Sequence, residues 1–120
     1  MTLLVNNQPL TIAVGQTDLG PLTLPVGAKN LLCTYANAGW PEPSDGAITV
    51  TLRLSNDSGA TYRDEWHDTF QHVALRRGGA LQSTAVFGIG LSTPFGPTSR
   101  LIVRFNSTVS VSTTVSVDAS

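Results

Sequence analysis

Apolar and polar residues alternate along most of this chain, and a repeat of two residues is the spacing of a β-strand with one buried face. The clearest stretch is Ile48–Leu54, where apolar residues occupy every even position and polar residues lie between them. Val109–Val117 repeats the pattern, with valine or threonine on one side and serine or threonine on the other. Helical spacing of apolar residues is never sustained for about ten residues, so we predict an all-β protein.

Turn-forming residues punctuate the chain at regular intervals and divide it into about eight to ten short strands. We therefore predict a single-domain antiparallel β-sandwich, jelly-roll-like, over residues 1–120, a common size for one domain. Residues 1–15 are expected to form an extended N-terminal arm or an edge strand. The apolar run Asn30–Ala36 is expected to be a strand buried on both faces or near an edge.

The charge balance excludes several classes of partner. Formal net charge is −1 and only 12% of residues are charged, so we expect neither nucleic acid nor a membrane surface as partner. Met1–Val5 lacks the basic start of an export signal, and no apolar run reaches the length of a membrane span, about 20 residues. The lack of an export signal predicts synthesis in the cytoplasm. So few charges give weak protection against self-association, which favours a homo-oligomeric assembly subunit over a free monomer.

Few residues could carry chemistry. Cys33, the only cysteine, lies in an apolar run without a neighbouring histidine or arginine and is expected to be a buried, inert thiol. Strand alternation would scatter the one cluster of acidic and histidine side chains over both faces of a sheet, as a solvated polar edge. We therefore expect no enzyme activity, no metal and no cofactor. That cluster consists of Asp64, Glu65, His67, Asp68 and His72.

Ser55–Tyr62 reads Ser-Asn-Asp-Ser-Gly-Ala-Thr-Tyr and resembles the Asp-box found on hairpins of sialidases and of many other β proteins. Ser55 and Asp57 can accept hydrogen bonds from loop amides, and Gly59 can adopt a positive φ. Thr61 and Tyr62 begin the next strand, with the tyrosine folded back onto the core. We interpret the box as a structural hairpin, since the chain has no room for the arginine cluster and nucleophile of a sialidase.

Three further segments are candidate interaction loops. Trp40 and Pro41 lie in a loop whose tryptophan could stack on a partner or pin the loop onto the sandwich. Arg76 and Arg77 put two positive charges at a turn, either solvated or in contact with a neighbour's carboxylate. Phe95 lies in a Pro-Phe-Gly-Pro loop, where we expect an exposed aromatic side chain.

Glycines alternate with bulky residues between Ala85 and Leu91. Gly88 and Gly90 share one face of the predicted strand, and Ile89 belongs to the other. A face of bare backbone indicates the close approach of another element, from this chain or from a neighbouring subunit.

The order of these features resembles small structural proteins of tailed bacteriophages, over roughly residues 20–118. The resemblance is carried by Leu24–Ala28, Gly39–Pro41, the Ser55–Tyr62 hairpin, the arginine-glycine turn 76–79 and the final valine-serine strand. It implies a β-sandwich that decorates or cements a capsid or lies at a head–tail junction. It further implies a location in the virion, with the major capsid protein, other virion proteins and further copies of itself as partners.

Two other functions are left open. A jelly-roll carbohydrate-binding module would use aromatic side chains as stacking platforms, with Trp40 and either Trp66 or Tyr35 as candidates. An enzyme would need His67 and Asp64 to converge in one pocket, and it ranks behind the other two functions.

Overall fold

The computed structural model describes residues 2–37, 47–71, 76–77, 80–81, 84–108 and 110–120, and all of its regular elements are strands. None of the described residues forms a helix that could cross a membrane. The strands, in chain order, are β1 (Thr2–Ile12), β2 (Gly15–Thr23), β3 (Asn30–Asn37), β4 (Ala47–Ser55), β5 (Arg63–Gln71), β6 (Arg76–Arg77), β7 (Ala80–Leu81), β8 (Thr84–Gly90), β9 (Arg100–Ser107) and β10 (Val111–Ala119).

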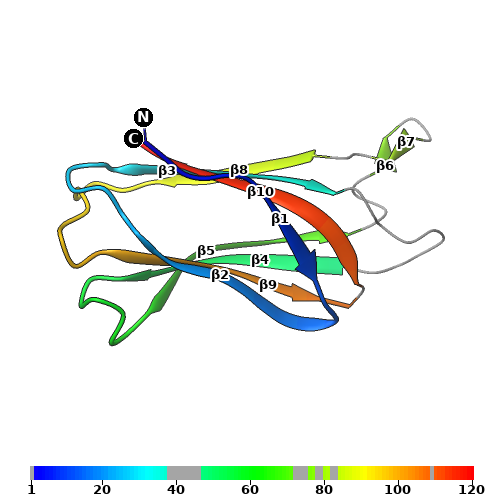
Figure 1. The fold of residues 1–120 in the computed structure, drawn as a ribbon, viewed down its shortest axis with the longest axis horizontal. Helices are drawn as coiled ribbons and strands as arrows, with labels where there is room; N and C mark the ends of the chain where they lie inside the picture. Colours follow the sequence, from blue (N-terminus) through cyan, green and yellow to red (C-terminus); the bar gives the residue numbers. More distant parts are fainter. Residues whose placement is uncertain (1, 38–46, 72–75, 78–79, 82–83, 109) are drawn as a thin grey trace.

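Two four-stranded antiparallel sheets form the two layers of the sandwich (Figure 1). Sheet A has the order β1-β10-β3-β8 and sheet B the order β2-β9-β4-β5, while β6 and β7 pair only with each other. Leaving that small hairpin aside, the first strand pairs with the last, the second with the second-last and the third with the third-last. The middle strands β4 and β5 form the central hairpin. This nested pairing is the jelly roll, so the predicted fold class is confirmed.

Strand alternation builds the core between the layers. In β9 and β10 every second side chain is buried and the residues between are more exposed. Tyr35 of sheet A meets Phe105 of sheet B edge to face, with ring centroids 6.2 Å apart and planes at 77°. Both side chains are buried, so this contact joins the two layers in the middle of the sandwich.

The strand β3 distinguishes the two alternatives predicted for Asn30–Ala36. It lies next to the edge strand β8 of sheet A, and only one of its faces is buried. Leu31, Cys33 and Tyr35 point into the core, whereas Leu32 is 43% exposed on the outer face. The prediction of two buried faces was wrong because an exposed leucine hid the alternation.

The N-terminal segment is placed in the sheet. Residues 2–12 pair with β10 at the edge of sheet A, and the pairing starts with Thr2 opposite Ala119. Of the two alternatives, the structure shows the edge strand. The two chain ends therefore lie side by side at one end of the sandwich (Figure 1).

That same end is closed by loops, and Phe95 lies there. Its side chain is only 4% exposed and packs into the core. Its backbone N–H donates to Ala28 O at 2.8 Å, and its carbonyl accepts from Gly27 N at 2.9 Å. The expectation of an exposed aromatic was wrong, because the open end of a two-layer core needs an apolar cover and Phe95 supplies it.

Candidate interaction surfaces

The Asp-box hairpin is held by its own side chains. Ser55 Oγ accepts from the backbone N–H of Gly59 at 2.9 Å and donates to Asp57 Oδ1 at 2.6 Å. The Asp57 carboxylate accepts from the Thr61 N–H at 2.9 Å and also from its hydroxyl. Positive φ angles at Ser58 (59°) and Gly59 (92°) form the turn between Asp57 and Thr61. The hydrogen bonds from the Ser55 hydroxyl, and then those from Thr61, lower the pKa of Asp57 to about 2.

The hairpin is also attached to the loop between β8 and β9. Ser58 N–H donates to Thr98 O at 3.0 Å, and Thr98 Oγ1 donates to Asn56 O at 2.6 Å. Tyr62 lies under the guanidinium of Arg53, whose Cζ is 5.7 Å from the ring centroid. All the described contacts of the box are therefore internal to this end of the sandwich, where they fix the loops against each other.

A pocket of about 270 Å³ opens between this hairpin and the β8–β9 loop. Buried Leu54 and Phe95 line it together with polar side chains, among them Asn56. Arg63 and Glu65 form an ion pair at the same pocket. The pocket therefore combines an apolar part with hydrogen-bonding groups of both signs.

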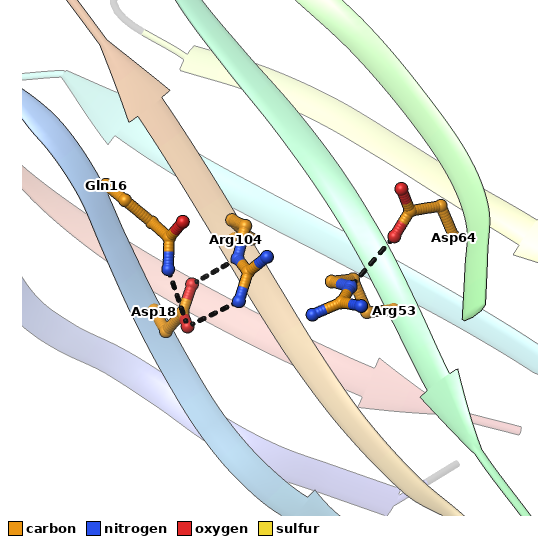
Figure 2. Close-up of polar contacts among 5 residues, drawn as sticks. All are labelled: Gln16, Asp18, Arg53, Asp64 and Arg104. Carbon is orange, nitrogen blue, oxygen red and sulfur yellow. Dashed lines mark hydrogen bonds and ion pairs between the residues drawn. The ribbon is translucent and has the colours of Figure 1, made fainter. Parts of the chain in front are cut away.

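The outer face of sheet B carries a network of paired charges, shown in Figure 2. Asp18 of β2 accepts two hydrogen bonds from Arg104 of β9, at 2.9 and 3.1 Å, and a third from Gln16 at 3.3 Å. Arg53 of β4 donates to Asp64 of β5 at 2.8 Å. The hydrogen bonds to Asp18 raise the pKa of the Arg104 guanidinium above its ordinary value. Each arginine in this view has a carboxylate partner from the neighbouring strand, so the network ties the strands together.

Two members of the predicted acidic and histidine cluster form ion pairs with different arginines. Asp64 pairs with Arg53 and Glu65 with Arg63. The side chains of the other three members, His67, Asp68 and His72, lie outside the described part of the structure. Within the described ranges, no group of three or more His, Cys, Asp or Glu side chains is arranged to hold a metal ion.

Sheet A has a very different outer face. Its four strands contain a single charged residue, Asp118. The register aligns Leu3, Asp118, Leu32 and Gly88 in one row across the sheet. Leu3 and Leu32 are 48% and 43% exposed on either side of the carboxylate. Removing this nearly uncharged face from water would require the desolvation of only one charged group, Asp118.

At the edge of sheet A, β8 follows β3 closely. Thr84–Gly90 pair with Asn30–Ala36 over seven consecutive positions without a register shift. A Cβ added at Gly88 would lie 2.4 Å from Leu31 O, so only glycine permits this approach. The close neighbour indicated by the glycines is thus a strand of the same chain.

The remaining sequence candidates fall in different places. Trp40 and Pro41 lie outside the described residues, and so do the side chains of Arg76 and Arg77, which form β6. Tyr35 is 1% exposed and cannot act as a stacking platform, and its burial raises the pKa of the phenol.

The sequence matches no protein-family model, and no curated protein matches it at a significant level. The contrast between the two outer faces was missed in the sequence analysis, although the charges that produce it are visible there. Its signal appears only after each strand is assigned to a sheet, because the strands of the two sheets are interleaved along the chain.

Proposed function

We propose that this chain is a non-enzymatic structural subunit of a tailed-bacteriophage virion, a capsid decoration or cement protein that is made in the host cytoplasm. The observation that carries the proposal is the outer face of sheet A, with Asp118 as its only charge and two exposed leucines. Charged groups are costly to bury, and the centres of protein interfaces are accordingly depleted of them. A surface of this composition is suited to lie against another protein.

Two further features support the proposal. The chain resembles phage structural proteins over most of its length, and jelly-roll sandwiches occur in viral capsid proteins as well as in lectins. Fold alone does not determine function, so the fold is compatible with the proposal without carrying it. On a particle with many equivalent sites, weak contacts made by many copies would give firm attachment.

The direct test is mass spectrometry of purified particles, followed by rebinding of the purified chain to particles that lack it. We expect wild type to bind and Leu32→Asp to bind at least about tenfold more weakly, because the new carboxylate must be desolvated at the contact. Val26→Asp is the matched control, since Val26 is 70% exposed in a loop outside the sheet. The proposal would be contradicted if mass spectrometry did not find this chain in purified particles. It would also be contradicted if Leu32→Asp bound to particles as tightly as Val26→Asp.

The alternative function, a jelly-roll carbohydrate-binding module, is favoured by the pocket beside the Asp-box hairpin. Its volume, about 270 Å³, is just below the roughly 300–1,000 Å³ typical of small-molecule sites and suits a ligand of about one sugar ring. Arg63, Glu65 and Asn56 would supply hydrogen bonds to hydroxyl groups. A glycan array tests this function. Any binding should be lost in Arg63→Ala and retained in Arg104→Ala, which removes an arginine from the network on sheet B.

A further inference from the structure

Edge strands expose unpaired backbone N–H and C=O groups, and proteins commonly block them with bulges, charges or proline. Three of the four edges of this sandwich are blocked in this way. The pairing of β1 shifts twice before Pro9, and that of β2 shifts across Gly20–Pro21. The pairing of β5 skips Glu65, within the charged triplet Arg63–Glu65.

The fourth edge, β8, has none of these devices. Thr84–Gly90 contains no charged residue and no proline, and its register with β3 is unbroken. In the part of the chain that the structure describes, no strand pairs with β8 on its other side. Because hydrogen bonds in an antiparallel pair alternate along each strand, about half of the backbone groups of β8 point away from β3. These groups form a ready template for another strand.

We propose that β8 pairs antiparallel with β8 of a second copy of this chain, which joins the two sheets A into one continuous sheet. This inference builds on the proposed assembly role and names the partner of one edge. Full overlap of the two strands puts a two-fold axis at Phe87, the central residue of Thr84–Gly90. Gly88 is then opposite Val86 of the second copy, and Gly90 is opposite its Thr84.

This register makes the strand complementary to itself. Each glycine faces a β-branched residue, so a position without a side chain is matched with a bulky one. No two like charges meet, since the strand has none. The low charge of the whole chain adds little repulsion between copies.

The other edges explain why the occupant is a second β8. Pairing of β8 with β1, β2 or β5 of another copy would meet bulges, proline or charge at each of them. Pairing of β8 with itself is isologous and therefore closes at two copies, leaving no open edge of the same kind. A seven-residue edge contact is smaller than a standard interface, so we expect a dimer with a dissociation constant in the micromolar range.

Sedimentation velocity of the full chain over a range of concentrations tests the inference. The mass of wild type should rise from 12.6 kDa towards twice that value. Val86→Lys should weaken the dimer at least about tenfold, because a lysine at a strand edge opposes pairing. Val14→Lys, the matched control, makes the same change in the turn between β1 and β2, where Val14 is 69% exposed, and should dimerise like wild type.

Hydrogen exchange of the wild-type chain gives a second test, which applies even if the Val86→Lys variant does not fold. In wild type, the amides of β8 that do not bond to β3 should exchange hydrogen more slowly as protein concentration rises, while those of β2 and β5 should not change. A wild type that stays monomeric, a folded Val86→Lys that dimerises normally, or protection at another edge would each overturn the inference. A monomer that still binds particles would refute the dimer and leave the virion role intact. A chain that dimerises but is absent from particles would refute the virion role and leave the dimer intact.

Discussion

Replacing Phe95 by alanine tests the assignment of this side chain to the core. Phe95 lies in the loop before β9, where flanking glycine and prolines led us to expect an exposed aromatic, yet only 4% of its surface is accessible. Two backbone hydrogen bonds to the β2–β3 loop hold it in place, so the loop cannot readily collapse into the space left by the ring. The substitution therefore distinguishes a cover of the core from a surface contact residue.

The expected loss of stability is large. Truncating a buried phenylalanine to alanine costs about 3–5 kcal/mol. At an unfolding entropy of about 2.1 cal/mol/K per residue, each kcal/mol lowers the Tm of a chain of this length by about 4 °C. We expect Phe95→Ala to lower the Tm by about 12–20 °C. An exposed side chain would change stability by less than about 0.5 kcal/mol, which corresponds to about 2 °C.

Thermal unfolding followed by circular dichroism, with urea unfolding as a second probe, measures the difference. Val26→Ala serves as the exposed control, because Val26 is 70% accessible in the loop that contacts Phe95. Phe95→Leu keeps most of the apolar volume and should lose less than the alanine variant. A drop below about 4 °C in Phe95→Ala would refute the burial of this ring and restore it as a candidate contact residue.

Three further predictions concern single groups. The pKa of Asp57, about 2 in the folded chain, is below the value of about 3.9 in an unfolded chain. Its carboxylate therefore stabilises the fold fully above about pH 4 and loses this effect as pH falls towards 2, so the Tm advantage of wild type over Asp57→Asn should shrink over that range. Burial, and secondarily the charge of Asp118, raises the pKa of Cys33 to about 12. Iodoacetamide at neutral pH should therefore label the Cys33 thiol far more slowly in the folded chain than in urea. Equal labelling rates would contradict the burial of Cys33. Gly88→Ala should cost about 1–3 kcal/mol in urea unfolding because its Cβ would meet a backbone oxygen, whereas Gly96→Ala, with no atom within 4 Å of the new Cβ, should be nearly neutral.

The fold was predictable because its signal is local and repeated. The alternation in Ile48–Leu54 appears in the structure as a strand whose even positions are all buried. The jelly-roll class followed from the number and spacing of such strands. What the alternation could not give was the order of the strands, because hydrogen-bond partners such as β1 and β10 lie at opposite ends of the sequence.

The candidate surfaces were less predictable than the fold. Whether Phe95 is exposed depends on where its loop ends in space, and the turn-forming residues around it indicate only that a loop exists. Exposed Leu32 looked like part of a buried run because hydrophobicity does not reveal which face a strand turns to solvent. The hydrogen bonds of the Asp-box, by contrast, connect residues at most four apart and could be anticipated from Ser55 and Asp57 alone.

The pairing of β1 with β10 also governs when this protein can fold. Sheet A needs the last strand in its interior, so the first strand has no partner until β10 has been synthesised. Contacts between such distant parts of a chain carry a large loop-closure entropy and belong to proteins that fold slowly, in about milliseconds to seconds. During that interval β1 and β3 are unpaired on the sides that β10 will cover. Nascent copies made close together are therefore most prone to aggregate before the last strand arrives, and a lower expression level, with fewer incomplete copies present at once, should increase the soluble yield.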